Sequence, residues 1–161
     1  MATPRSLIQQ MQIVQVLQPA TDAAGRTGAY LSVKNSGKVA ILVQIQQGNA
    51  ATVALNLLQA QDVAGTGSKA LVASQLAVNL DESTSDLLVA QAAASTYTTD
   101  AGLKNKIVVF EVDEAALDIA NGFRTVTVQT GASNVANVTS AVFLGYAERY
   151  AGATMPSAIL N

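Results

Sequence analysis

Alternation of apolar and polar positions is the dominant pattern of this chain, and it predicts strands. The clearest case is the stretch from Val39 to Gln46, where the odd-numbered positions are all Val or Ile. A period of two indicates a strand, because successive side chains of a strand point to opposite faces. The alternation from Thr52 to Gln61 favours a second strand that pairs with the first, although its Ala and Leu content would also permit a helix.

Residues 103–130 predict the most distinctive unit of the chain. A β-branched run from Ile107 to Val112 indicates a buried strand. Asp113 is placed to cap a short helical turn near 114–120, and Asn121-Gly122 is typical of a chain reversal. The alternating stretch that follows indicates a second strand. We expect both strands in the central sheet, with the acidic groups of the connection, Glu114 and Asp118, at the surface.

The remaining strands are less sharply defined. Gln12 to Leu17 predicts a first strand that stops at Pro19. Ala29 to Lys34 and the turn after it predict a hairpin with the Val39 strand. Leu87 to Thr98 contains both helical and β-like stretches, and its neighbours favour a strand. Val138 to Tyr146 alternates cleanly and predicts the last strand.

Together these segments predict about eight or nine short strands at near-regular spacing, which favours an all-β fold. We expect a single-domain antiparallel β-sandwich or barrel, jelly-roll-like, over residues 1–161. The β core is expected at 12–146. An N-terminal arm at 1–11 and a C-terminal tail at 147–161 are expected to be extended.

Composition narrows the possible partners. Half of the residues are hydrophobic, but only 12% are charged, and the net charge is −2. Such a chain has no electrostatic footprint for DNA or RNA. No apolar run approaches the length of a membrane span, and the N-terminus lacks the continuous apolar core of a signal peptide. We therefore expect synthesis in a cytoplasm and neither nucleic acid nor membrane as partner.

Reactive chemistry is sparse. The chain has no histidine and no cysteine, which excludes Ser-His-Asp and Cys-His catalysis and thiolate metal sites. Paired carboxylates remain, but the sequence has no Trp to line a sugar cleft. We expect no enzymatic activity, no catalytic residues, no cofactor and no metal.

Four local motifs have plainer explanations than binding. AGTGSK, residues 64–69, departs from the phosphate-loop spacing and indicates a surface loop. DESTSD, residues 81–86, and VDEAALD, residues 112–118, lack the calcium-loop frame and indicate a solvated turn and a capped helix. The sequon Asn137-Val138-Thr139 indicates the start of a strand.

The chain resembles a family of small structural proteins encoded beside the major capsid protein in tailed bacteriophages and related prophages. Four segments carry the resemblance: AYLSVKNSGKVAILVQIQQG, AQDVAGTGSKAL, IVVFEVDEAALDIANGFRTVTVQT and AVFLGYAERYAG. The third is the most specific, because a strand, an acidic turn and NGF in that order are uncommon. The resemblance implies a virion protein of the phage head, most simply a capsid decoration or cement protein.

What the resemblance implies can be stated concretely. The partners would be the major capsid protein and other copies of this chain, as a homotrimer or homodimer. The protein would bind the outside of the head and bridge capsid subunits. A tail or connector protein is the alternative, and a carbohydrate-binding β-sandwich is a more distant one. The candidate anchors are the apolar residues of the arms, namely Leu7, Ile8, Met155, Ile159 and Leu160.

Overall fold

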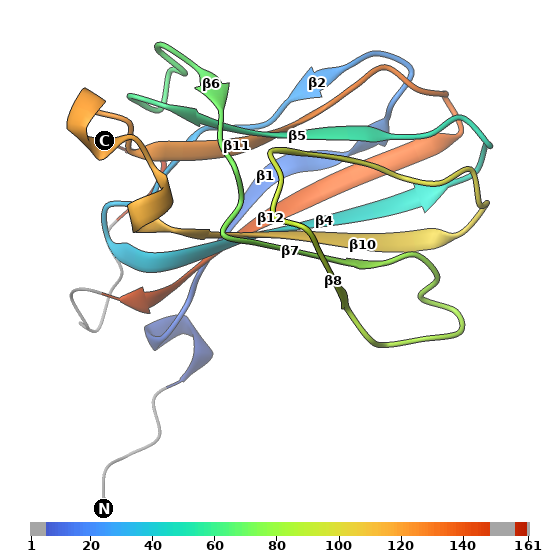
Figure 1. Ribbon diagram of the computed structural model, residues 1–161, viewed down its shortest axis with the longest axis horizontal. Helices are drawn as coiled ribbons and strands as arrows, with labels where there is room; N and C mark the ends of the chain where they lie inside the picture. The colour runs from blue at the N-terminus through green and yellow to red at the C-terminus, as the bar shows by residue number, and fades with distance from the viewer. Residues whose placement is uncertain (1–5, 149–156, 161) are drawn as a thin grey trace, which may run out of the picture.

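Two antiparallel sheets packed face to face make up the protein (Figure 1). The structure, a computed structural model, describes residues 6–148 and 157–160. Its helical content within these residues consists of short 3-10 turns. The all-β prediction is therefore confirmed, and of the two architectures the observed one is the single-domain sandwich.

The first sheet, called sheet A, has the strand order β1-β12-β4-β10-β7-β8. All neighbouring strands run antiparallel. The long strands β12, β4 and β10 lie in the middle, and β1 and β8 form the two edges. The bounds are β1 Gln12–Thr21, β4 Ser36–Gln47, β7 Gln75–Asn79, β8 Val89–Gln91, β10 Asn105–Asp113 and β12 Asn137–Glu148.

The second sheet, sheet B, is built on β11 and β5, which pair over six residues from Thr125↔Ala60 to Thr130↔Leu55. Short strands complete it: β2 and β3 pair with β11, and β6 and β9 pair with β5. The bounds are β2 Arg26–Thr27, β3 Leu31–Ser32, β5 Ala54–Ala60, β6 Lys69–Ala70, β9 Thr96–Thr98 and β11 Thr125–Thr130.

The core lies between the sheets and is built from small side chains, with Phe110 and Phe143 as its largest apolar members. One phase of each sheet A strand points inward. Ile41, Val43 and Val108 are fully buried there, opposite Leu57 and Val128 of sheet B and their neighbours. Burying each such side chain contributes about 1.5–3 kcal/mol, so a chain with few aromatics still gains a stable core.

The distinctive unit at residues 103–130 crosses from one sheet to the other. Strand β10 belongs to sheet A and β11 to sheet B, so the prediction that both lie in one central sheet is wrong. Two short 3-10 helices, η2 (Glu114–Ala116) and η3 (Ile119–Asn121), make the crossing. Gly122 ends η3 with φ +83, a left-handed conformation that favours glycine.

Asp113 stands at the N-cap position of η2, as predicted, but its side chain makes no capping hydrogen bond. Its carboxylate lies 3.2 Å from Lys38 Nζ on the neighbouring strand instead. The dipole of a short 3-10 turn is small and stabilises a carboxylate only weakly. The lysine on the neighbouring strand is therefore the better partner for Asp113.

Three strand assignments need correction. β4 and β5 do not pair, because β4 lies between β12 and β10 while β5 pairs with β11. β3 pairs with β11, so the predicted hairpin with β4 is also wrong. The first strand continues past Pro19 to Thr21, with register shifts against β12. An edge strand tolerates proline, because its missing N–H can face away from the sheet.

Candidate protein interface

The face of sheet A that points away from sheet B is apolar along its middle. Alternate residues of β12, β4 and β10 lie there, as the pairings Val142↔Leu42 and Leu42↔Val109 show. Neither of the two sheets covers this face, and in Figure 1 η1 (Leu7–Gln9) and the β7–β8 connection lie on its side of the molecule. We call this surface the outer apolar face. Its members are Ile13, Ala40, Leu42, Ile107, Val109, Val142 and Leu144.

Most of these side chains are partly buried by one another, which is how a flat row of β-branched residues shields its own carbon atoms. Ile13, at the β1 edge, is 53% exposed. Antiparallel sheets with one solvated face normally alternate apolar and polar residues, whereas these central strands are apolar in both phases. That feature is the expected signature of a face that binds another protein.

One end of the outer apolar face carries a compact charged group. Lys38 Nζ lies 3.6 Å from Glu111 Oε1 and 3.2 Å from Asp113 Oδ1. Hydrogen bonding to Asp113 raises the pKa of Lys38. Burial, and then a hydrogen bond to Glu111, raise the pKa of Tyr146 beside them. One lysine thus faces two acidic side chains, so the formal charge of the group is −1.

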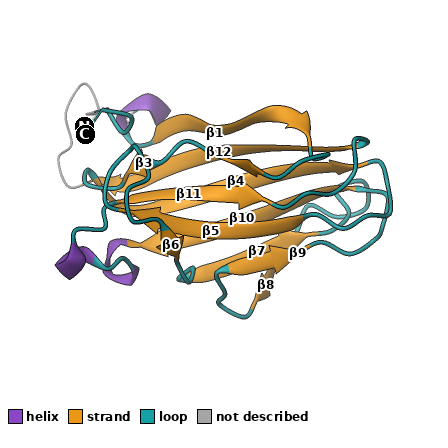
Figure 2. Cartoon of the chain, turned by 90° about the horizontal axis from the view of Figure 1, so that it is seen from above, coloured by secondary structure: helices purple, strands orange, loops and turns teal. Residues whose placement is uncertain are grey.

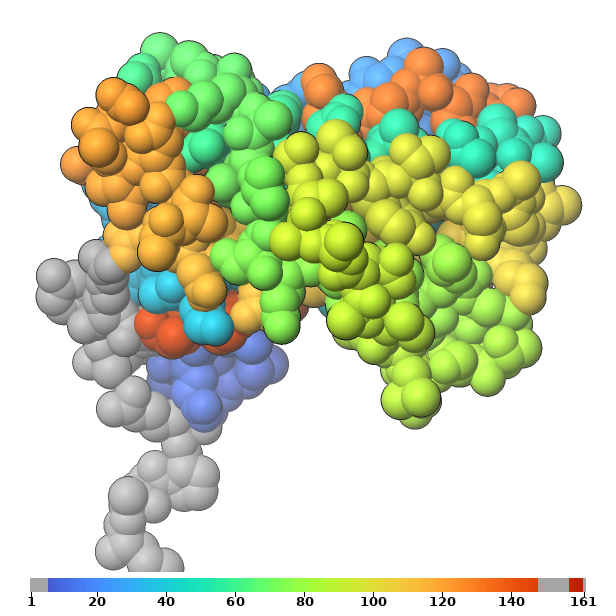
Figure 3. Space-filling model, viewed as in Figure 1, coloured from blue at the N-terminus to red at the C-terminus, as the bar shows by residue number. Residues whose placement is uncertain are grey.

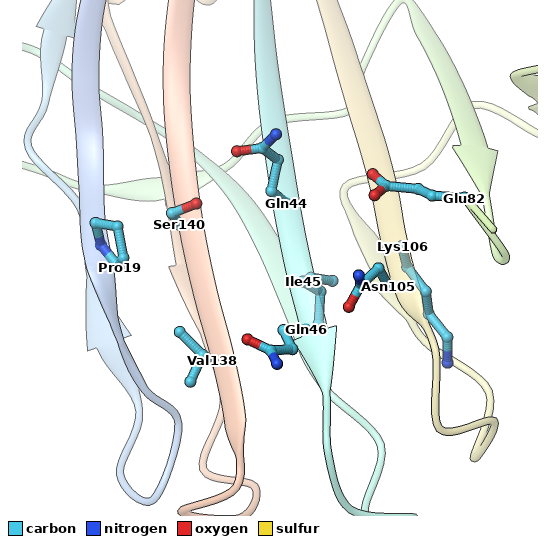
Figure 4. A pocket seen from close by; sticks show the side chains of 9 residues that line it. All are labelled: Pro19, Gln44, Ile45, Gln46, Glu82, Asn105, Lys106, Val138 and Ser140. Carbon is cyan, nitrogen blue, oxygen red and sulfur yellow. The ribbon is translucent and has the colours of Figure 1, made fainter. Parts of the chain in front are cut away.

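The other end of this face opens into a hollow of about 360 Å³ (Figure 4). Figure 4 shows the amides of Gln44 and Gln46 and the hydroxyl of Ser140 on adjacent strands at its lining. The Glu82 N–H donates to Asn105 O at 3.1 Å and holds the β7–β8 connection against the rim. The hollow therefore combines the Glu82 carboxylate with uncharged donors and acceptors, a mixture that suits the polar groups of a protein partner.

The predicted anchors of the arms lie elsewhere. Leu7 and Ile8 stand on η1 and are strongly exposed, and so are Ile159 and Leu160. Ala158, next to Ile159 in the sequence, is buried, and its carbonyl accepts a hydrogen bond from Ser32 N of β3. Figure 2 shows η1 and β3 at the same end of the sandwich. Met155 lies outside the described residues.

Sequence reasoning did not identify the outer apolar face as a site. The signal was present, since IVVF (residues 107–110) and AVFL (residues 141–144) are apolar at consecutive positions. Without the strand order, however, such runs are indistinguishable from strands buried on both sides. The structure shows β12, β4 and β10 side by side, which joins three modest apolar rows into one surface.

The glycine-rich loop at 64–69 is a surface turn, as predicted. Its amides at Ala64 and Thr66 donate to Asp62 Oδ1, each at 3.0 Å. The hydrogen bond from Thr66 is the main cause of the lowered pKa of Asp62. A carboxylate of the protein therefore occupies the amides that a phosphate would need.

The acidic motifs are likewise engaged within the protein. Asp81 pairs with Lys104 and accepts hydrogen bonds from Ser83. Asp118 lies 2.5 Å from Lys69 Nζ. Among the residues the structure describes, no cluster of three or more metal-ligating side chains occurs.

The sequon Asn137 is the first residue of β12, as predicted, and it is fully buried. Its side-chain amide donates to Ala51 O at 2.7 Å and to Ser133 Oγ at 2.9 Å. Glycosylation would require this side chain at the surface. In the structure the Asn137 side chain instead joins the loops that contain Ala51 and Ser133.

Comparisons with known proteins give a distant structural similarity and no family. In the described ranges, no helix has the length and apolar character to cross a membrane. No protein-family model matches the chain, and no curated protein matches it. The crystal structure of the SPBc2 prophage-derived protein YomS aligns with a TM-score of 0.48 and 14% identity, covering 83% of this chain and 91% of that one. A similarity at this level assigns no function.

Proposed function

We propose that this protein is a non-enzymatic capsid decoration or cement protein of a tailed phage, which binds the outside of the head and bridges capsid subunits. The observation that carries the proposal is the outer apolar face, a rigid sheet surface left uncovered by both sheets of the sandwich. The sequence resemblance to phage head proteins points to the same role.

The physical properties of this face suit a contact repeated many times on a shell. Its Val and Ile side chains have few rotamers to lose, and they are already held by their neighbours. Little conformational entropy is therefore lost on binding, which leaves more of the apolar burial as affinity. Hydrogen bonds from the polar side chains of Gln44, Gln46 and Ser140 would fix the orientation of the bound partner.

The exposed arm residues would add contacts beyond the sandwich. Leu7 and Ile8 at one terminus, and Ile159 and Leu160 at the other, leave large apolar surfaces in water. On a lattice, such residues can be buried on a neighbouring capsid subunit or on another copy of this protein in a homotrimer or homodimer. The major capsid protein is the proposed partner, and the virion head is the proposed location.

The test is to add purified protein to phage heads that lack it and to measure binding and the temperature at which the heads rupture. We expect binding and a higher rupture temperature. Val109→Lys, in the middle of the outer apolar face, is expected to abolish both, because a charge there opposes burial.

Val135→Lys is the matched control, since Val135 lies on a loop and is already 66% exposed. It should bind as the wild type does, and far-UV circular dichroism should show both variants folded. Failure of the wild-type protein to bind heads would contradict the proposal. Labelling of intact particles that is confined to the tail would favour the tail or connector role.

A further inference from the structure

The two edges of sheet A are built differently. At the β1 edge, the Arg26 guanidinium donates to Gln18 O at 2.9 Å and to Ala20 O at 3.0 Å. Pro19 lies between these carbonyls, and the Ala29 N–H donates to Val16 O. Proline, charge and register shifts are the usual means by which a sheet edge avoids pairing with another chain.

The β8 edge has none of these protections. Among the described strands only β7 pairs with β8, so one side of β8 is open. From residue 87 to residue 99 the sequence contains no charged residue and no proline. An edge strand without charge or proline presents its outward N–H and C=O groups to another strand, and within β8 the Gln91 side chain donates to Val89 O at 3.4 Å.

The open edge is also apolar. Leu87, Leu88 and Val89 are 70%, 49% and 59% exposed. A hollow of about 300 Å³ runs along the hairpin, with Val78 and Leu80 among its lining residues. Figure 3 shows the segment at residues 80–91 standing out from the body of the molecule. Large exposed apolar side chains next to an open strand edge indicate a surface that becomes buried in an assembly.

We infer that β8 is the site at which two copies of this chain associate, by antiparallel pairing of β8 with β8 of the second copy around a two-fold axis at Ala90. In this register residue 89 faces residue 91 of the other copy, and 88 faces 92. The bulky half of the segment, Leu87 to Val89, then lies opposite the small half, Gln91 to Ala93. Centring the axis on Leu88 would set large side chains against each other.

The charge distribution around β8 favours antiparallel over parallel pairing of two copies. The paired residues are uncharged, so identical segments meet without repulsion. Asp86 precedes the segment, and antiparallel pairing sets the two Asp86 carboxylates at opposite ends, roughly 25 Å apart at the rise of a strand. Parallel pairing would place them side by side. The inference does not depend on the capsid role, because it concerns only the free protein.

The chain has no cysteine, so a single introduced thiol reports on this contact. Across a two-fold antiparallel pair the two Ala90 Cα atoms would lie about 4.5–5.5 Å apart, within disulfide range. Under mild oxidation, we expect Ala90→Cys to form a covalent dimer and the control Ala132→Cys, on an exposed loop, to stay monomeric. A monomeric Ala90→Cys protein, or equal cross-linking of both variants, would overturn the inference.

Charge exchange provides a second test, using sedimentation equilibrium of the full chain. Ala90→Lys and Ala90→Glu each place two like charges across the axis and should weaken dimerisation at least tenfold, whereas their equimolar mixture should restore it. Ala132→Lys should leave dimerisation unchanged. A wild-type protein that remains monomeric at high micromolar concentration, or a dimer insensitive to both Ala90 variants, would contradict the proposal.

Discussion

The Lys106 ammonium lies 2.6 Å from Asp100 Oδ1, although the Lys106 side chain is wholly buried and the Asp100 side chain is 54% exposed. The ammonium also donates to Gln47 Oε1 at 2.8 Å and to Asp100 O at 3.0 Å. This cluster closes one end of the sandwich, joining β10 and β4 to the loop after β9. A buried lysine is tolerated because three oxygen atoms replace its hydration shell.

Because Lys106 is buried and Asp100 is half exposed, removal of Asp100 should cost more stability than removal of Lys106. Asp100→Ala should lower the free energy of unfolding by about 3 kcal/mol, because it leaves a buried cation short of its counter-charge. Lys106→Met should cost about 1 kcal/mol, since Asp100 can be hydrated and Gln47 Oε1 keeps its bond from Thr99. Urea unfolding of both variants measures the difference. A larger loss for Lys106→Met would contradict this account of the cluster.

Stability should be flat from about pH 5 to pH 8, because the chain has no histidine to titrate there. Hydrogen bonds from Lys106 and Lys69 lower the pKa of Asp100 and Asp118, respectively. A carboxyl with a lowered folded pKa stabilises the fold above its unfolded pKa and loses that contribution as the pH falls through the folded value. The free energy of unfolding should therefore decrease below about pH 4.

At alkaline pH the free energy of unfolding should decrease as the pH rises. Burial raises the pKa of Tyr146, so its contribution is complete below the unfolded pKa and is lost as the pH rises above about 10. Urea titrations between pH 2 and 11 check both limbs. Asp100→Asn should show a shallower acid limb, and an unchanged acid limb would exclude Asp100 as a contributor.

Gly65→Ala should destabilise the protein more than Gly122→Ala. Both glycines have positive φ, +85 and +83, so each substitution costs about 1 kcal/mol of backbone strain. A methyl group at Gly65 would also lie 2.7 Å from the Tyr30 ring, whereas nothing lies within 4 Å at Gly122. Thermal unfolding of the two variants compares them directly, and equal losses would show that the ring moves aside freely.

Arg26→Lys should cost about 2 kcal/mol despite keeping the charge. The planar guanidinium donates to the carbonyls of Gln18, Ala20 and Thr139 and to the buried Asp22 carboxylate. A lysine ammonium has three donors at one point and cannot span these positions. Chemical denaturation gives the loss, and a variant as stable as the wild type would show that the β1 edge does not depend on this fork.

The positions of the strands depend on local sequence patterns, so the sequence alone predicted most of them. Side chains of a strand alternate between faces, so the pattern at Val39 to Gln46 predicted the strand β4 without any knowledge of its partners. The absence of histidine and cysteine similarly limited the chemistry before any fold was known. The reversal at Asn121-Gly122 followed from the conformations that these residues tolerate.

The pairing of the strands is non-local, and only the tertiary structure decided it. An apolar face packs equally well against several partners, so the pattern did not show that β4 joins β12 and β10, or that β10 and β11 lie in different sheets. The candidate surfaces depend on that order. The outer apolar face exists because three strands from distant parts of the chain lie side by side, and β8 is open because no described strand lies beyond it.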